Sequence, residues 1–265
     1  MTEPAAGADL AGAAAPFRAA PAECAIVTDF DGTLAPIVDD PITARALDGA
    51  VEVLHALSER YGRVAVVSGR PVEFLGARLH AAGRDDLGLV ISGLYGLERL
   101  ERGHVMIHPS ALRWIDVVAG VVERAEKEAP PGVRVERKGL STTLHVREAP
   151  DAAGWARSFA DAAAATTGLV VHDARMSFEL RPPVGVDKGT VVAELTEGMS
   201  AACFLGDDYG DLPAFDALDR LAARSGSAVL RVAVRSEEAP PELLSRADLL
   251  VDGPAGALAF LRALL

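Results

Sequence analysis

The sequence predicts an α/β protein in which an open parallel sheet is interrupted by an inserted α+β cap domain. Near the start of the chain and again after residue 185, short apolar runs alternate with helical patterns, which is typical of a parallel sheet covered on both faces. Between these parts the order becomes helix, two strands, helix, two strands, which suits an antiparallel sheet with helices on one face. We therefore predict a Rossmann-like core at 22–101 and 184–265, with a cap at 102–183.

In the first part of the core, two helices separate three strands. Apolar residues at helical spacing predict a helix at 43–61 with Thr43 as its N-cap. The next helix is expected to begin at Pro71, because proline is favoured at the first helical position. The three strands are expected at the apolar run 24–27, at the β-branched run 63–70, which ends in small polar residues, and at 87–92.

The cap and the second part of the core are delimited by turn residues. A hairpin at 97–107 turns at Arg102 and Gly103, and a second hairpin turns at Gly139. The cap elements that follow the first hairpin are expected at 110–129, 133–138, 141–147, 151–167, 169–174 and 177–181. The elements of the returning core are expected at 187–197, 201–205, 211–223, 229–234, 238–245, 249–251 and 256–265.

Composition narrows the class of protein. The formal net charge of −12 argues against a nucleic-acid or anionic-membrane surface, which would need clustered lysine and arginine. No window holds about eighteen uninterrupted apolar residues, so we expect no membrane span. Residues 1–21 are mostly Ala, Gly and Pro without the basic start and apolar centre of a secretory signal, and we interpret them as a disordered tail. Cys24 and Cys203 each lie in an apolar run, which favours free thiols in a reducing cytoplasm.

Polar residues gather where the predicted parallel strands end, and ligands of open α/β sheets bind at that edge. Two aspartates about 4 Å apart repel by roughly 4 kcal/mol at an effective dielectric constant near 20, so they need a counter-charge. A hard cation bound by carboxylate oxygens meets this need, and Mg²⁺ commonly uses a few carboxylates together with substrate phosphate. The side chains expected at the edge are those of Asp29, Asp31, Ser68, Lys188, Asp207, Asp208 and Asp211.

Four short motifs contribute these polar residues: D-x-D-G-T at 29–33, S-G-R at 68–70, D-K-G at 187–189 and G-D-D-x-x-D at 206–211. Together they resemble the motifs of the haloacid dehalogenase superfamily, Mg²⁺-dependent phosphatases that work through an aspartyl-phosphate. Taken singly, each has an ordinary structural explanation, such as a strand-end cap for Ser68 or a helix N-terminus for Asp208 and Asp211. Their joint order makes coincidence improbable.

The resemblance implies a role for each matching residue. Asp29 would be the nucleophile and Asp31 the general acid and base, with the backbone carbonyl of Asp31 facing the metal. Asp207 would complete the metal ligands, while Asp211 would orient water or hold Lys188. Asp208 is expected either beside the metal or in that same supporting role. The phosphoryl oxygens would be bound by Ser68, Lys188 and the backbone N–H groups of Gly32 and Gly69.

The predicted cap carries three recognisable segments. These are V-E-R-K-G-L-S at 135–141, L-H-V-R at 144–147 and F-E-L-R-P-P-V-G-V-D-K-G at 178–189, at the join between cap and core. They resemble, in that order, the E-x-K-G-x-S, L-H-x-R and E-x-R-P-x-x-x-x-K-G segments of trehalose-6-phosphate phosphatases. Together with 29–37 and 231–253, the resemblance covers nearly everything after the tail.

This resemblance implies which residues would bind the sugar. Glu136 and Lys138 lie two residues apart on one predicted strand, so they would point to the same face and share neighbouring hydroxyls. The alternative is an ion pair on an exposed sheet. Glu179, Arg70 and Tyr95 are weaker candidates for sugar contacts. His145 is interpreted as an ordinary strand residue.

Two segments depart from the family pattern. The family usually carries G-x-H-G where this chain has Tyr95 at the third position, and G-D-D-x-T-D-E where Gly210 and Leu212 replace Thr and Glu. We therefore keep sucrose-phosphate and mannosyl-phosphoglycerate phosphatases as alternatives. A catalytically silent sugar-phosphate sensor is a further one. We expect a monomer with a small sugar phosphate as its partner, and a cap that hinges near 100–103 and 182–185.

Overall fold

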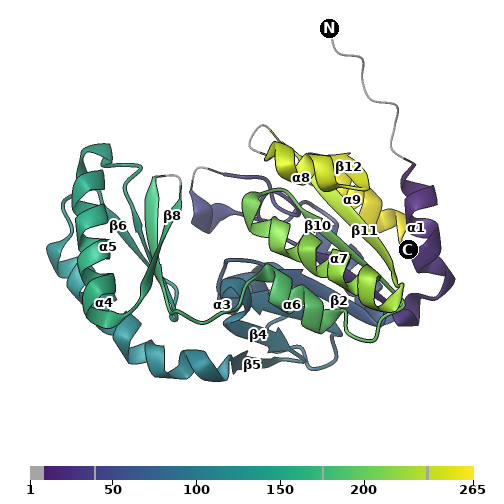
Figure 1. Cartoon of the computed structure of the whole chain (residues 1–265), viewed down its shortest axis with the longest axis horizontal. Coiled ribbons are helices and arrows are strands. Elements are labelled where there is room, and N and C mark those ends of the chain that lie inside the picture. Colours follow the sequence, from purple (N-terminus) through teal and green to yellow (C-terminus); the bar gives the residue numbers. More distant parts are fainter. Residues whose placement is uncertain (1–8, 39, 175, 237–238) are drawn as a thin grey trace, which may run out of the picture. The chain divides into compact units, whose positions relative to one another are not determined.

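The computed structural model describes residues 9–38, 40–174, 176–236 and 239–265, and it divides into two compact units. The first unit combines Met1–Met106 with Val186–Leu265, and the second is Ile107–Gly185. A continuous unit is thus inserted into a discontinuous one (Figure 1). Within the described ranges no helix combines the length and the apolar character that crossing a bilayer requires.

The first unit is built on an eight-stranded sheet in the order β12-β11-β10-β1-β2-β3-β4-β5. The strands from β12 to β3 are parallel to their neighbours, and β4 is antiparallel to β3. The fold is therefore the mostly parallel α/β sheet that was predicted. The strand bounds are β1 Cys24–Thr28, β2 Arg63–Val67, β3 Leu89–Gly93, β4 Glu98–Glu101, β5 His104–Ile107, β10 Ala201–Gly206, β11 Ala228–Arg235 and β12 Leu249–Asp252.

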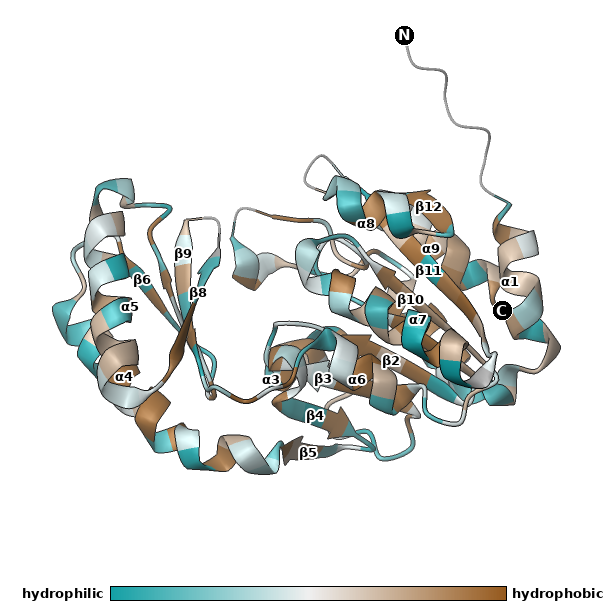
Figure 2. Ribbon diagram, in the orientation of Figure 1, coloured by the Kyte–Doolittle hydropathy of each residue, from teal (hydrophilic) through white to brown (hydrophobic). Residues whose placement is uncertain are grey.

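Helices cover both faces of this sheet, as the continuous apolar strands predict. Along β1, Ile26 packs into one hydrophobic cluster while its neighbours Ala25 and Val27 pack into another. The first cluster contains residues of α1, α2, α3 and α9, and the second contains residues of α6, α7 and α8. Figure 2 shows the result, with hydrophobic strands beside helices that are hydrophilic on one side. The helix bounds are α1 Leu10–Ala19, α2 Ala50–Arg60, α3 Val72–Arg78, α6 Lys188–Leu195, α7 Leu212–Ser225, α8 Pro241–Arg246 and α9 Gly253–Ala263.

The second unit is a four-stranded sheet in the order β6-β7-β9-β8, with every neighbouring pair antiparallel. Helices α4 and α5 pack against one face, where Leu144 and Leu180 are fully buried among helix residues such as Val122 and Ala160. This is the α+β arrangement that was predicted. The bounds are α4 Ile115–Glu128, β6 Arg134–Arg137, β7 Thr142–His145, α5 Ala153–Thr167, β8 Val170–Ala174 and β9 Ser177–Arg181.

The prediction of a disordered tail over 1–21 is wrong for its second half. Residues 10–19 form helix α1, in which Ala14 and Phe17 are buried in the core cluster. Arg18 Nη1 donates to the carbonyl oxygen of Ala263 at 2.6 Å, which ties α1 to the end of the chain. An alanine-rich composition is compatible with both coil and helix, and here the burial of Phe17 selects the helix. Residues 1–8 lie outside the described ranges.

Two boundaries also differ from the predictions. The inserted unit begins at Ile107 rather than 102, because β4 and β5 extend the sheet of the first unit instead of starting the second. The helix predicted at 43–61 begins only at Ala50, so Thr43 is not its N-cap. Thr43 instead ends a separate 3-10 turn, Pro41–Thr43.

Candidate active site

The parallel pairing of β1 with β10 brings the two main acidic motifs together. Thr28 is in register with Leu205, and the N–H of Asp29 donates to the Leu205 carbonyl oxygen at 2.8 Å. Asp29 follows the last residue of β1, and Asp207 follows the last residue of β10. Both side chains therefore lie at the carboxyl edge of neighbouring strands, where ligands of such sheets bind.

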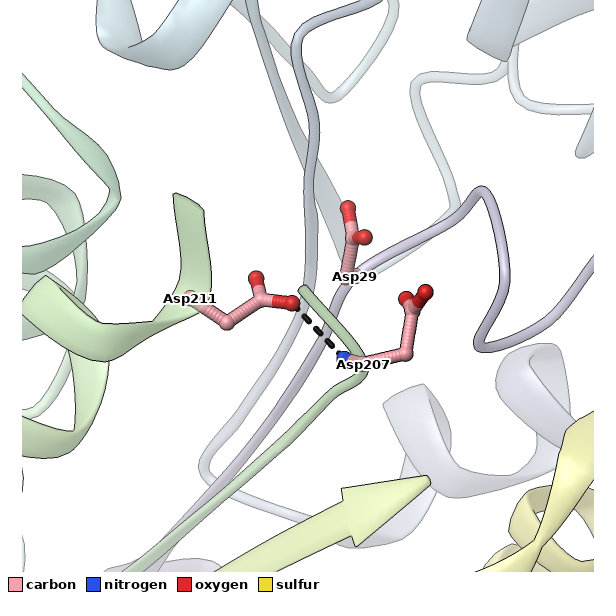
Figure 3. Close-up of side chains that lie close together, drawn as sticks. All are labelled: Asp29, Asp207 and Asp211. Atoms are coloured by element: carbon pink, nitrogen blue, oxygen red, sulfur yellow. Dashed lines mark hydrogen bonds between the residues drawn. The ribbon is translucent and has the colours of Figure 1, made fainter. Parts of the chain in front are cut away.

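Three carboxylates meet at this edge and form an acidic cluster of Asp29, Asp207 and Asp211 (Figure 3). One oxygen of each lies within 4.8 Å of the others, and all three side chains are buried. Burying like charges at this separation is unfavourable unless cations compensate them. The cluster is therefore built to face positive charge.

Lys188 supplies part of that charge. Its Nζ lies 3.0 Å from Asp29 Oδ1 and 2.6 Å from Asp211 Oδ1, and the residue is only 3% exposed. Lys188 begins α6, and the helix start is fixed by a capping box in which Asp187 and Thr190 exchange side-chain to backbone hydrogen bonds. The local sequence D-K-G-T thus aims the ammonium at the cluster.

Asp211 is occupied by donors rather than free to bind a ligand. Oδ1 accepts from Lys188, and Oδ2 accepts from the N–H of Asp207 at 2.8 Å and from the N–H of Asp208 at 3.1 Å. Figure 3 shows the bond from Asp207 N as a dashed line. The expectation that Asp211 holds Lys188 is confirmed. Asp29 and Asp207 are left as the two members whose oxygens could hold a metal.

Asp207 is held by the D-x-D-G-T loop itself. Thr33 Oγ1 donates to Asp207 Oδ1 at 2.9 Å. Gly32 has φ +76°, and a Cβ at this position would come within 2.0 Å of Asp207 Oδ2. Glycine is therefore required here both for the backbone conformation and for the close approach of the carboxylate.

The electrostatics of the cluster follow from burial and repulsion. Burial raises the pKa of Asp29 well above its usual value, with Lys188 opposing and the neighbouring aspartates adding to the rise. Burial, together with the charges of Asp211 and Asp208, raises the pKa of Asp207 to about 8. For Lys188, burial would lower the pKa, but the charges of Asp211 and Asp29 outweigh it and raise the pKa well above 10.5. One ammonium faces three carboxylates, so the donor set fits a divalent cation.

Asp208 does not join the cluster, contrary to its prediction as a metal ligand. Its residue is exposed, and its side chain accepts from the Asp211 N–H in a capping box around the short 3-10 turn Tyr209–Asp211. The turn rotates Asp208 outward and Asp211 inward. Spacing in G-D-D-x-x-D did not decide between them, because a loop has no fixed side-chain period.

The S-G-R loop lies at the end of β2, between the loops that follow β1 and β3. Ser68 is buried, its Oγ accepts from the N–H of Arg70 at 3.2 Å, and its carbonyl oxygen accepts from the N–H of Tyr95 at 3.0 Å. A Cβ on Gly69 would lie 2.5 Å from the phenol of Tyr95, so the ring fills the space beside this loop. Tyr95 itself has φ +59°, an uncommon conformation for a tyrosine. The structure thus packs Tyr95 directly against the S-G-R loop.

Two predicted ligand contacts are already used inside the protein. The N–H of Gly32, predicted to bind phosphoryl oxygens, donates to the Ala35 carbonyl oxygen at 2.7 Å. The guanidinium of Arg70, predicted to contact sugar, donates through Nε and Nη2 to the two carboxylate oxygens of Asp31, each at 2.8 Å. The side chain of Asp31 therefore faces Arg70 rather than the acidic cluster.

In the second unit, the predicted sugar residues lie on the sheet face opposite α4 and α5. Lys138 Nζ lies 3.2 Å from Glu179 Oε1 and 3.8 Å from Glu136 Oε2. His145 Nε2 is 2.8 Å from Glu136 Oε2, and Arg181 also binds Glu179. The structure therefore contains the ion pair given as the alternative. The carboxylates of Glu136 and Glu179, together with the cations beside them, still form a surface suited to binding hydroxyl groups. Sequence reasoning missed Arg181 and His145, whose strand positions alone did not reveal their carboxylate partners.

Glu179 is the buried centre of this second group. Burial alone would raise its pKa, but the charges of Lys138 and Arg181 and the hydrogen bonds from Arg181 and Ser141 lower it below the usual value. Ser141 Oγ donates to Glu179 Oε1 at 2.9 Å. The carboxylate is thereby kept ionised and fixed in direction.

Comparison with known proteins gives the same family from sequence and from structure. The family model described as trehalose-phosphatase matches residues 27–246. Trehalose-phosphate phosphatase of Mycolicibacterium paratuberculosis is 37% identical over 205 residues, which cover 73% of this chain and 51% of that protein. The chain thus spans about half the length of this relative.

Solved structures share the fold. A trehalose-6-phosphate phosphatase related protein superposes with a TM-score of 0.74 at 26% identity, over 90% of this chain and 95% of the other. A haloacid dehalogenase-like hydrolase from Bacteroides thetaiotaomicron superposes with a TM-score of 0.61 at 18% identity, over 91% of this chain and 99% of the other. The family match across both units and the relative at 37% identity show that the chain belongs to the trehalose-phosphatase family.

Proposed function

We propose that the chain is a Mg²⁺-dependent phosphatase that hydrolyses trehalose 6-phosphate to trehalose and phosphate through an aspartyl-phosphate on Asp29. The observation that carries the proposal is the buried contact of Asp29 with Lys188, 3.0 Å apart, beside Asp207 in a chain of this family. One oxygen of the buried Asp29 carboxylate contacts the Lys188 ammonium, and the Asp207 carboxylate lies close by. Once cations screen these negative charges, the Asp29 carboxylate can attack phosphorus.

In the first half of the reaction, Asp29 attacks phosphorus and the bond from phosphorus to the sugar oxygen breaks. Asp31 gives its carboxyl proton to that oxygen, so trehalose leaves as a neutral alcohol. In the second half, Asp31 takes a proton from water as the water oxygen bonds to phosphorus. The bond from phosphorus to Asp29 then breaks, and inorganic phosphate and the free Asp29 carboxylate are restored.

Charge that develops on the transferring phosphoryl group has to be stabilised by fixed donors. In our proposal these are Lys188 Nζ, Ser68 Oγ and the backbone N–H of Gly69. Support comes from their positions, with Ser68 and Gly69 at the carboxyl end of β2 and Lys188 at the start of α6. The N–H of Gly32 is not included, because it donates to Ala35.

The residues present fit a divalent cation, with Asp29 and Asp207 as its side-chain ligands and the backbone carbonyl of Asp31 as a further one. Mg²⁺ is our choice because it favours few carboxylates and substrate phosphate. When bound, it would neutralise phosphoryl oxygens during transfer.

Substrate choice is assigned to the polar sheet face of the inserted unit. Glu136 and Lys138 are proposed to bind sugar hydroxyls, with Glu179 holding Lys138 in place. The relative named above carries trehalose phosphate in its name, which supports this sugar over sucrose or mannosyl phosphates. We further propose a monomer acting in the cytoplasm, a compartment that suits the two free, buried cysteines.

The experiment is phosphate release from a panel of sugar phosphates, with Mg²⁺ and with EDTA. We expect trehalose 6-phosphate to give the highest kcat/KM, and EDTA to abolish release. A higher kcat/KM for sucrose 6-phosphate or mannosyl-3-phosphoglycerate would replace the substrate and keep the chemistry. Binding of a sugar phosphate without turnover of any panel member would favour a silent sensor and overturn the proposal.

A further inference from the structure

Arg70 joins the loops that follow three neighbouring strands. Its guanidinium binds Asp31 after β1 through two hydrogen bonds of 2.8 Å. Its backbone N–H donates to Ser68 Oγ after β2 at 3.2 Å, and its carbonyl oxygen accepts from the N–H of Leu94 after β3 at 3.0 Å. One residue therefore links the proton-transfer carboxylate to the loops beside it.

The side chain of Arg70 is fixed by an aromatic contact as well. Its guanidinium carbon lies 4.8 Å from the ring centroid of Phe74, and the side chain is 14% exposed. The Phe74 ring meets the buried ring of Phe30 edge-on at 6.2 Å, and Phe30 stands between Asp29 and Asp31 in the chain. A planar guanidinium held in this way matches a carboxylate with two parallel hydrogen bonds, which a lysine cannot do.

We propose that Arg70 is a positioning residue for Asp31, which it aims at the leaving oxygen during phosphoryl transfer. The inference rests on the proposed function and replaces the sugar contact expected for Arg70. Proton transfer is efficient only when donor and acceptor stay within hydrogen-bond distance. The flexible side chain of Asp31 is 29% exposed and would otherwise sample several directions.

The step that Arg70 supports is the first proton transfer. As Asp29 forms its bond to phosphorus, the bond to the leaving oxygen breaks and that oxygen takes the proton from the carboxyl group of Asp31. Both Asp31 oxygens accept from Arg70 in the structure, so the protonated form keeps one of these two bonds and opens the other. The remaining bond fixes the direction of the acid.

The test uses substituted phenyl phosphates, whose leaving groups differ in pKa but carry no sugar. Phosphate release is measured with Mg²⁺ for the full chain and for Arg70→Ala, and kcat/KM is plotted against leaving-group pKa. An acidic phenol leaves without help, whereas a weakly acidic one needs a well-placed proton donor. We expect Arg70→Ala to be near wild type for the most acidic phenols and to lose about 10- to 100-fold for the least acidic, a part of the 10²- to 10⁴-fold that acid catalysis supplies.

Three further variants separate positioning from structure. Arg78 lies over the same Phe74 ring at 4.8 Å but donates to the carbonyl oxygens of Ala44 and Ile42, so Arg78→Ala should keep the wild-type slope. Arg70→Lys retains the positive charge but cannot donate two parallel hydrogen bonds, so its plot of kcat/KM against leaving-group pKa should have an intermediate slope. Arg70→Ala combined with Asp31→Asn should be no steeper than Asp31→Asn alone.

The outcomes that overturn the inference are distinct from those that overturn the function. An equal loss of kcat/KM across the phenyl series, or a loss confined to sugar phosphates, would show that Arg70 does not position the acid. A wild-type chain that releases phosphate from no compound would remove the proposed function and this inference with it.

Discussion

Lys188 Nζ and Asp29 Oδ1 form a buried contact of 3.0 Å, and each of the two residues also faces a second charged group. Lys188 also binds Asp211 at 2.6 Å, while Asp29 also faces Asp207. The ammonium is thus anchored by Asp211 independently of Asp29. Asp29 can therefore change its bonding during a reaction without leaving Lys188 as an unpaired buried charge, which would be costly.

Asp29→Asn should abolish turnover and leave the fold intact. An amide cannot form the acyl-phosphate, and loss of a catalytic nucleophile commonly costs about 10⁴-fold or more in kcat. Lys188 keeps its contact with Asp211, so we expect no loss in the free energy of unfolding. Acid quench of the wild-type chain during turnover should trap phosphate on the peptide that contains residue 29, and the variant should trap none. Normal turnover in Asp29→Asn would eliminate the covalent mechanism.

Strand positions were the most predictable part of the fold. The run 24–27 is apolar on both faces because β1 is buried between two helical layers, and such runs mark parallel strands. Helix α1 was not predictable, because Phe17, its largest buried side chain, packs against parts of the chain that are distant in sequence. Local composition gives no information on such contacts.

The site was predictable to the level of which loops meet, but not to the level of which oxygen faces which group. Asp29 and Asp207 had to be neighbours once their strands were parallel and adjacent. The inward turn of Asp211 and the pairing of Asp31 with Arg70 depend on loop geometry, which no periodicity describes.

Gly32→Ala should weaken metal-dependent activity. The substitution adds a Cβ that would lie 2.0 Å from Asp207 Oδ2 at a φ of +76°, so the carboxylate has to move. We expect half-maximal activity to require at least about tenfold more Mg²⁺, corresponding to about 1.4 kcal/mol of lost binding free energy. The measurement is a Mg²⁺ titration of phosphate release.

Gly83→Ala is the matched control for this change. Gly83 has a similar φ of +72°, but a Cβ there meets nothing within 4 Å. It should lose stability through backbone strain, about 1 kcal/mol, and keep the wild-type Mg²⁺ requirement. The same Mg²⁺ shift in both variants would show that strain, not displacement of Asp207, is responsible.

Glu136→Ala and Lys138→Ala should each reduce kcat/KM for trehalose 6-phosphate far more than for a small aryl phosphate. Each side chain is proposed to bind sugar hydroxyls, and loss of a hydrogen bond to a charged group costs about 1.5–3 kcal/mol, or roughly 10- to 150-fold. Arg137 provides the control, since it lies between them on β6 but pairs with Glu126 on an exposed surface. Equal losses on both substrates would assign Glu136 and Lys138 to stability.

The stability of the inserted unit should decrease as the pH is lowered, because Glu179 loses its charge. Its pKa is lowered in the folded state, so its ionised form contributes stability above the ordinary value of 4.5, and this contribution is lost as the pH falls through the folded pKa. Glu179→Gln removes the charge and leaves Lys138 and Arg181 less compensated. Hydrogen exchange of the β7 and β9 amides should therefore be faster in the variant at pH 7, with the difference from wild type shrinking as the pH is lowered below about 4.5. Glu126→Gln changes a surface carboxylate that pairs with the exposed Arg137, and this variant should exchange close to wild type throughout. A difference for Glu179→Gln that persists at low pH would contradict the assigned cause.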